Sequence, residues 1–123
     1  MIPTEAQEQK MLFEWAEWAK GKYPELDLMY HIVNEGRRSL RYGNELKKQG
    51  MKKGVPDICL PVPAPCHHYI GLYIEMKRRD RSLSKVSDEQ RGWLAALNRV
   101  GHYAVVCYGW EEARNVILEY LRR

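Results

Sequence analysis

The segment from Tyr69 to Lys77 (YIGLYIEMK) constrains the fold of this chain more than any other part of the sequence. β-Branched and aromatic residues dominate it, which predicts a buried β-strand. Because alternate residues of a strand point to opposite faces, Glu75 and Lys77 share one face and Met76 lies on the other. Burying a charge is costly unless the charge is paired or bound to a metal. The end of this strand is therefore a candidate functional site.

A second predicted strand supplies another acid. It runs from Val55 to Val62 (VPDICLPV), and a loop rich in proline joins it to the first, so the two are expected to pair antiparallel. That pairing brings Asp57 close to Glu75. Two neighbouring carboxylates repel each other unless a cation lies between them, and carboxylate oxygens suit Mg²⁺ or Mn²⁺. Such an ion polarises a phosphodiester and activates water, and Lys77 would orient that water or stabilise charge on the phosphate.

The rest of the chain predicts a small α/β domain with a central mixed sheet. Apolar spacings of three and four residues predict helices over 5–20, 87–100 and 110–121, and a short helix over 40–49. Further strands are expected over 28–33 and 102–108. Thr4 is the expected N-cap of the first helix, and Ser87 with Gln90 fits a capping box. Gly101 is expected to end the third helix.

Aromatic residues have two possible uses in such a domain. Three tryptophans lie on apolar helix faces and are expected in the core: Trp15, Trp18 and Trp93. Three tyrosines remain candidates for stacking on nucleobases: Tyr30, Tyr42 and Tyr69.

Positive charge is concentrated in one stretch. The chain has 20 Lys and Arg against 16 Asp and Glu, for a net charge of +4. The densest group lies between residues 34 and 53 and consists of Arg37, Arg38, Arg41, Lys47, Lys48, Lys52 and Lys53. We expect this group to contact a nucleic-acid backbone, and the alternative is a merely solvated face.

Other classes of protein are disfavoured. No apolar run approaches the roughly 18 to 20 residues that span a bilayer, and the first ten residues lack an apolar signal core. Three widely spaced cysteines indicate neither a disulfide framework nor a CxxC zinc site, so a cytoplasmic location is expected. The adjacent His67 and His68 lack a second cluster that would complete a zinc site.

The ordered motifs resemble those of a known family. They are G-V-P-D (54–57), I-E-M-K (74–77), S-x-x-Q-x-x-W (87–93) and the final G-H-Y-A-V-V-C strand (101–107). Together they resemble the PD-(D/E)xK nuclease superfamily and, within it, the VRR-NUC group of virus-type replication-repair nucleases. The resemblance implies a restriction-endonuclease-like core, with a central mixed β-sheet flanked by helices, in a single domain over residues 1–123.

The resemblance also implies roles for individual residues. Asp57 and Glu75 would bind the metal with the main-chain carbonyl of Met76, and Lys77 would assist the attacking water. Gln90 would lie at the edge of the site, although its place in a capping box explains it equally well. A glutamate of the first helix would complete the site. Glu5 is slightly favoured, and Glu8, one turn further, is the alternative.

The function implied is a DNA endonuclease that depends on Mg²⁺ or Mn²⁺ and needs no small-molecule cofactor. Small stand-alone members resemble Holliday junction resolvases, which implies a branched DNA substrate, a role in repair, recombination or replication, a homodimer, and a bacterial or phage origin. The alternatives are a non-catalytic DNA-binding module with a nuclease fold, and a nuclease for flaps or single-stranded DNA. An RNA nuclease is a weaker alternative.

Overall fold

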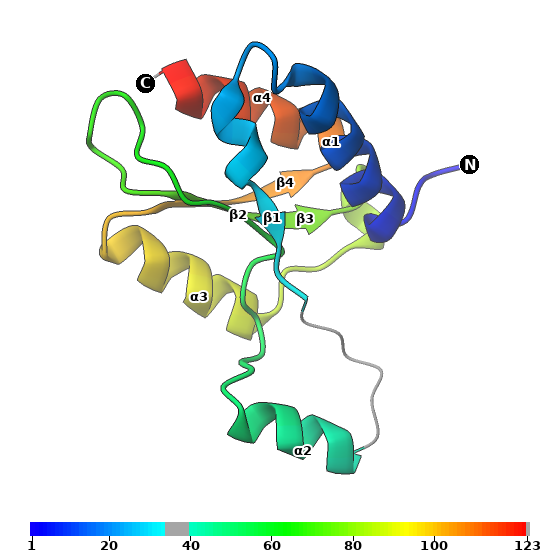
Figure 1. Ribbon diagram of the computed structural model, residues 1–123. Coiled ribbons are helices and arrows are strands. Elements are labelled where there is room, and N and C mark those ends of the chain that lie inside the picture. Colours follow the sequence, from blue (N-terminus) through cyan, green and yellow to red (C-terminus); the bar gives the residue numbers. More distant parts are fainter. Residues whose placement is uncertain (34–39, 123) are drawn as a thin grey trace.

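The computed structural model describes residues 1–33 and 40–122 (Figure 1). Its helices are α1 (Glu5–Ala19), α2 (Leu40–Lys48), α3 (Asp88–Arg99) and α4 (Trp110–Arg122), with short 3₁₀ helices η1 (Pro24–Leu28) and η2 (Arg81–Leu83). Its strands are β1 (Tyr30–His31), β2 (Ile58–Leu60), β3 (Leu72–Lys77) and β4 (Tyr103–Tyr108).

The strands form one mixed sheet in the order β1-β2-β3-β4. The β1–β2 and β2–β3 pairs are antiparallel, whereas β3 and β4 are parallel and α3 connects them. Ile58 lies opposite Ile74 in the β2–β3 register. The residue just before β2, Asp57, therefore lies across from Glu75 at the end of the pair. The predicted α/β architecture with a mixed central sheet is confirmed.

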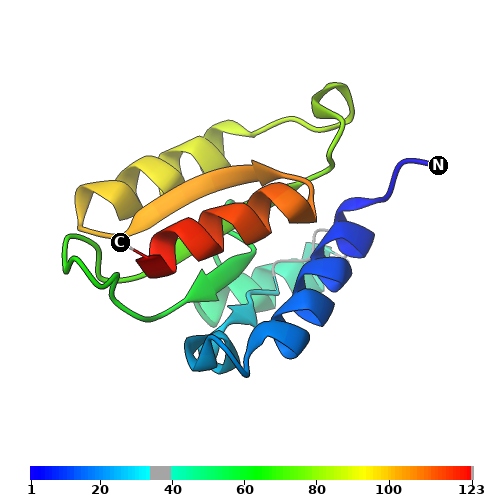
Figure 2. The same cartoon turned by 90° about the horizontal axis from the view of Figure 1, so that it is seen from above.

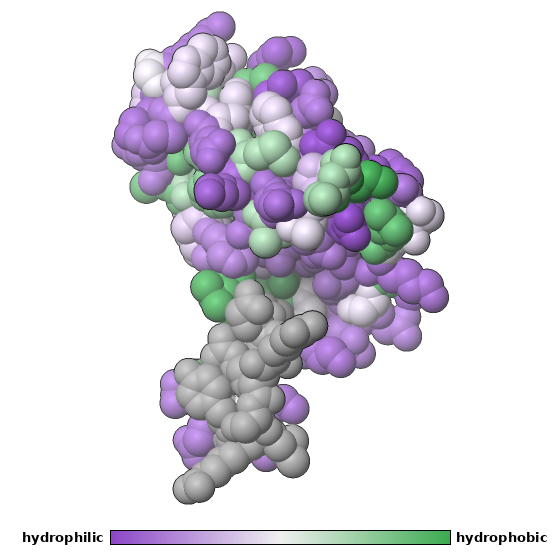
Figure 3. Space-filling view, turned by 90° about the vertical axis from the view of Figure 1, so that its right-hand side faces the viewer, coloured by the Kyte–Doolittle hydropathy of each residue, from purple (hydrophilic) through white to green (hydrophobic). Residues whose placement is uncertain are grey.

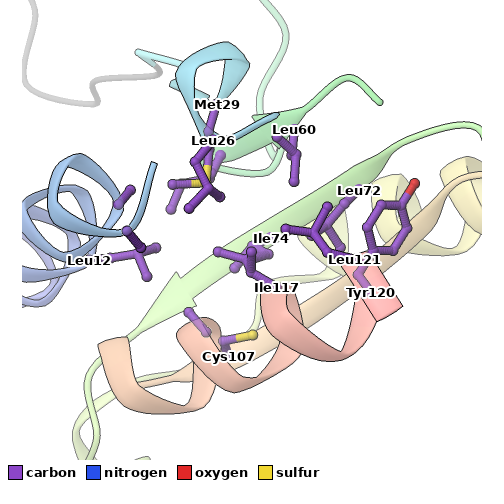
Figure 4. Packing of buried hydrophobic residues seen from close by; sticks show 14 of the residues in the cluster. Leu12, Leu26, Met29, Leu60, Leu72, Ile74, Cys107, Ile117, Tyr120 and Leu121 are labelled. Carbon is purple, nitrogen blue, oxygen red and sulfur yellow. The ribbon is translucent and has the colours of Figure 1, made fainter. Parts of the chain in front are cut away.

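Helices cover both faces of the sheet (Figures 1 and 2). α1 and α4 pack together on one face, and α3 packs along β4 on the other. Figure 4 shows the main core between the first pair of helices and the sheet, where Leu12, Ile74 and Ile117 are fully or almost fully buried. Burying a side chain of this size contributes roughly 1.5–3 kcal/mol. Met76 belongs to this core, so Glu75 and Lys77 point to the other face, as the alternation in β3 predicts.

Two sequence predictions were wrong in detail. The strand expected over 28–33 is reduced to the two residues of β1, because Pro24 begins a 3₁₀ helix that buries Leu26 and ends at Leu28. Trp18 was expected in the core, yet it is 83% exposed. The core side of α1 is occupied by smaller side chains at this end, Ala16 and Ala19, so the indole between them in sequence faces outward.

α2 stands apart from the layered body, on the same side of the sheet as α3 (Figure 1). Hydrophilic side chains cover most of the face shown in Figure 3, and hydrophobic residues appear there only in small groups. Within the described residues, none of the helices is long and apolar enough to cross a membrane.

Candidate active site

Three carboxylates meet at the end of the β2–β3 pair. Carboxylate oxygens of Glu5, Asp57 and Glu75 lie within 4.8 Å of one another. Asp57 directly precedes β2, which places it across from Glu75 in the antiparallel register. Oδ2 of Asp57 accepts a hydrogen bond from the main-chain N–H of Met76 at 2.7 Å. The structure therefore brings together the two acids expected from the strand pairing and adds Glu5 from α1.

The loop before Asp57 is fixed against α3. Gly54 has a φ of +92°, and a Cβ built on it would lie 2.7 Å from the main chain of Glu89. A glycine is needed here because any side chain would collide with the first turn of α3. The indole N–H of Trp93 donates to the carbonyl of Lys53 at 3.1 Å. These contacts hold Asp57 and the first turn of α3 close to each other.

His31 fixes the main chain of Asp57 from the other side. Its Nδ1–H donates to the Asp57 carbonyl at 2.8 Å, and the N–H of Ile32 donates to the same oxygen at 2.6 Å. No sequence pattern assigned this contact to His31. It depends on the pairing of β1 with β2, which brings together residues far apart in the chain.

Glu75 lies in an unusual environment. It is 2% exposed, and its Oε2 accepts a hydrogen bond from Nε2 of Gln90 at 3.2 Å and lies 3.7 Å from Nζ of Lys77. Its Oε1 is buried and has no hydrogen-bond partner among the described residues. Burial and then the charge of Asp57 raise the pKa of Glu75 to about 9, although Lys77 opposes the shift.

This donor set fits a divalent cation. A buried carboxylate oxygen without a partner, next to two further carboxylates, is costly on its own and becomes favourable when a cation binds all three. Oxygen-only ligands of this kind suit Mg²⁺ or Mn²⁺. Partial burial of its carboxyl raises the pKa of Glu5, and the charge of Asp57 adds to this shift, although Lys77 opposes it.

Gln90 combines the two roles that its sequence position left open. Its Oε1 accepts from the N–H of Ser87 at 2.9 Å, and the Ser87 hydroxyl accepts from the Gln90 N–H at 3.1 Å, which completes the predicted capping box. The remaining amide group, Nε2, is the one that donates to Glu75. Cap and site contact therefore coexist in one side chain.

The two acids of α1 have different surroundings. Glu5 reaches the cluster with Asp57 and Glu75. Glu8 is fully buried one turn further along, where Arg79 and the N–H of Trp110 bind its carboxylate. The alternative of Glu8 as a metal ligand therefore does not fit, because its oxygens are already engaged away from the cluster. Glu5 as a metal ligand stays a prediction, which the geometry of the cluster supports.

The basic residues lie on and beside α2. Lys47 and Lys48 are in its last turn, and Lys52 and Lys53 are exposed in the connection to Asp57. Arg37 and Arg38 lie outside the described residues. Arg41 is part of the α2 backbone, and the structure does not describe its side chain. Of the stacking candidates, Tyr69 packs against Tyr103 with ring centroids 5.1 Å apart, whereas Tyr30 is 49% exposed.

Comparison with known proteins agrees with this geometry. The model of the VRR-NUC domain matches residues 4–111, which include Glu5, Asp57, Glu75, Lys77 and Gln90. The chain belongs to the VRR-NUC family. A solved structure titled "VRR_NUC domain protein" is similar to this chain with a TM-score of 0.83 and 26% identity, over 99% of this chain and 91% of that one. No curated protein matches the sequence.

Membership in the VRR-NUC family gives this chain a nuclease-type fold. It also indicates nuclease activity, with DNA as the substrate, for which the acidic cluster provides a possible divalent-metal site. Four short motifs in the sequence indicate a resemblance to this family. That resemblance is confirmed over most of the chain.

Proposed function

We propose that this protein is a DNA endonuclease that hydrolyses phosphodiester bonds with the help of Mg²⁺ or Mn²⁺. One observation carries the proposal. The buried Oε1 of Glu75, which has no hydrogen-bond partner within residues 1–33 and 40–122, lies in a cluster with Asp57 and Glu5, and Lys77 approaches from the same strand. A cluster of this kind has no evident structural use, because it concentrates like charges at a buried position.

Asp57, Glu75 and Glu5 would hold the ion, with the main-chain carbonyl of Met76 as a further oxygen ligand. When bound, a divalent ion polarises the phosphodiester and lowers the pKa of a coordinated water. The Met76 N–H fixes the orientation of the Asp57 carboxylate, and the Nε2–H of Gln90 fixes that of Glu75. Both contacts preorganise the ligands, which is how groups around a metal site tune its affinity.

Lys77 is the residue of this chain best placed to act on the attacking water or the phosphate. It is 5% exposed and lies on the same strand face as Glu75. A buried ammonium interacts more strongly with developing negative charge than an exposed one does, because water screens it less. We propose that it orients the attacking water and stabilises charge on the phosphate.

The lysines beside α2 would bind the DNA backbone. Lys53 is exposed and lies only four residues before Asp57, and Lys47, Lys48 and Lys52 extend the positive charge away from the site. Arg37, Arg38 and Arg41 would belong to the same group. A plot of log affinity against log salt concentration has a negative slope. Replacing any one phosphate-binding residue by alanine would make this slope less steep by about one unit.

Branched DNA is the proposed substrate, and a homodimer the proposed assembly. Support comes from the resemblance to Holliday junction resolvases, in which paired sites cut two strands. The proposed context is DNA repair, recombination or replication in the cytoplasm of a bacterial host. Light scattering of the purified protein measures the mass of the assembly, and a monomer at the concentrations that support cleavage would contradict the paired-site arrangement.

A nuclease assay tests the proposal. The substrates are a four-way junction, a flap, a single strand and a linear duplex, each with Mg²⁺, Mn²⁺ or EDTA. Wild-type protein is compared with Asp57→Asn, Glu75→Gln and Lys77→Ala. Cleavage that needs the metal and disappears in all three variants is expected, with the four-way junction cut fastest.

Other outcomes have distinct meanings. Wild-type cleavage by Asp57→Asn would overturn the assignment of the site. Binding of a substrate without cleavage in either metal would favour a non-catalytic DNA-binding module. Faster cutting of the flap or single strand than of the junction would replace the branched substrate with one of those.

A further inference from the structure

Two arginines follow Lys77 directly and bind the N-terminal end of α1. Nε of Arg79 donates to Oε2 of Glu8 at 2.8 Å, and its NH2 group donates to Oε1 at 3.1 Å. Nε of Arg78 donates to the carbonyl of Pro3 at 2.9 Å, and its NH2 group donates to the carbonyl of Ile2 at 3.0 Å. One arginine therefore holds the first turn of α1, and the other holds the chain just before it.

Glu8 is the centre of the first contact. It is fully buried, and besides Arg79 it accepts hydrogen bonds from the main-chain N–H of Trp110 at 3.1 Å and of Arg79 at 3.3 Å. Burial raises the pKa of Glu8, but the hydrogen bonds from Arg79 and Trp110 outweigh it and leave the pKa below its ordinary value. This carboxylate ties α1 to the end of β3 and the start of α4.

Glu5 lies between these two attachments. It is the first residue of α1, exposed, and placed against the like charges of Asp57 and Glu75. The end of a helix frays easily, so the helix by itself does not fix the position of an exposed side chain in its first turn. Something must hold the helix end in place if Glu5 is to stay within reach of a cation.

We infer that Arg78 and Arg79, the latter through Glu8, are positioning residues that hold Glu5 at the metal site. The inference rests on the proposed function, because it assigns Glu5 to the metal. It connects Lys77 to α1, because the two residues directly after Lys77 hold the first turn of α1 in its place. The covalent chain alone does not fix this distance, because α1 and β3 are separated by more than 50 residues.

Mn²⁺ binding measured by calorimetry tests the inference without relying on cleavage. Arg79→Gln and Glu5→Gln are each expected to weaken Mn²⁺ binding about tenfold, within the range known for groups that orient metal ligands. The double variant is expected to bind Mn²⁺ no more weakly than Glu5→Gln alone, because Arg79 acts through Glu5. Arg79→Lys, which keeps one charged donor, is expected to recover part of the affinity.

Arg81→Gln is the matched control. Arg81 lies two residues further along and contacts the Tyr108 ring of β4 and Glu112 of α4. Its removal is expected to leave Mn²⁺ affinity unchanged. If Arg79→Gln fails to fold, Arg78→Gln tests the same coupling, because it removes the two bonds to the Ile2 and Pro3 carbonyls together with a positive charge that acts on Glu5, and the same decrease in affinity is expected.

The result that overturns the inference alone is a wild-type Mn²⁺ affinity in folded Arg79→Gln and Arg78→Gln while Glu5→Gln weakens binding. Additive decreases in the double variant would also overturn it, because they would show action independent of Glu5. If wild-type protein binds no Mn²⁺ at all, the proposed metal site fails and the inference fails with it. If Glu5→Gln binds as wild type, only the role of Glu5 and its positioning fail.

Discussion

α1 and α3 begin with the same local motif and use it differently. Thr4 and Gln7 form a capping box at α1, and Ser87 and Gln90 form one at α3. In both, the glutamine Oε1 accepts a hydrogen bond from the main-chain N–H of the N-cap residue at 2.9 Å. The N-cap hydroxyl accepts one from the main-chain N–H of the glutamine at 3.1 Å. Among the hydrogen bonds of the described residues, only Gln90 adds a further one, from its Nε2 to Glu75.

The difference lies in what faces each turn. Gln7 is exposed at the surface of α1, whereas α3 begins against the loop that carries Asp57, where Gly54 allows close approach. In the first turn of α1 it is the acids that contact other elements, Glu5 at the acidic cluster and Glu8 at Arg79. A capping box defines the start of a helix, and the neighbouring elements decide which of its side chains takes part in a site.

The largest expected effect comes from replacing Glu75, the side chain to which Gln90 donates a hydrogen bond. Glu75→Gln should reduce cleavage to the level seen with EDTA, because it removes the proposed central metal ligand. It should also raise the melting temperature of the metal-free protein at pH 7, since the pKa of about 9 means that Glu75 takes up a proton on folding there, and glutamine removes this cost. Cleavage assays and thermal melts in EDTA check this, and a variant that cuts DNA normally would contradict it.

Exchanging the glutamines for glutamates compares the turns directly. Glutamate serves a capping box as well as glutamine does, so Gln90→Glu and Gln7→Glu should both keep their helix starts. Gln90→Glu replaces the donor to Glu75 with a carboxylate and should lower cleavage by roughly 10- to 100-fold. Gln7→Glu should cut DNA at the wild-type rate. Equal activity in the two variants would show that Gln90 acts only as a cap.

The acids of the two first turns should differ in stability. Glu8→Ala leaves buried N–H donors of Arg79 and Trp110 unpaired, which should cost roughly 1–3 kcal/mol of unfolding free energy. Glu89→Ala in α3 is the matched control, because Glu89 is exposed and alanine keeps the Cβ that packs on Gly54. Its cost should stay within about 0.5 kcal/mol. Urea unfolding of both variants measures these values, and equal costs would contradict the anchoring role of Glu8.

The smallest expected effect is the pH dependence that Glu8 of α1 contributes. Hydrogen bonds from Arg79 and Trp110 hold the pKa of Glu8 below its ordinary value of 4.5 despite burial. The ionised carboxylate therefore stabilises the fold above the unfolded pKa, and this contribution is lost as pH falls through the folded pKa. Glu8→Gln should melt with a flatter pH profile than wild type below about pH 5. Gln90 carries no charge, so Gln90→Ala should leave the profile unchanged.

Several features of the fold were predictable from short stretches of sequence. The alternation in β3 placed Glu75 and Lys77 together on the face away from the core, and the structure has them there. Ser87 and Gln90 marked the start of α3, and Gly101, with a φ of +106°, marks its end. The antiparallel pairing of β2 with β3 was expected from the connecting loop and brought Asp57 to Glu75.

Other features depended on neighbours that no local pattern reveals. Trp18 fits the apolar spacing of α1, but this end of the helix packs through alanines and leaves the indole outside. The strand expected over 28–33 is reduced to Tyr30 and His31, because the 3₁₀ helix that Pro24 begins buries Leu26 and extends to Leu28. The partners of His31 and Arg78 were not predictable, since Asp57 and Pro3 lie far from them in the sequence, directly before β2 and just before α1.

By itself, the sequence determined the order of helices and strands, their caps, and the acid–acid–lysine set that indicates a nuclease. Capping, periodicity and strand alternation depend on residues within a few positions of one another, so short stretches encode them. Only the tertiary structure decided that Glu5 faces the cluster and Glu8 does not. The partners of Glu8 lie 71 and 102 positions away, at Arg79 and Trp110. A buried carboxylate must find its donors in space, and its sequence neighbours do not say where those donors are.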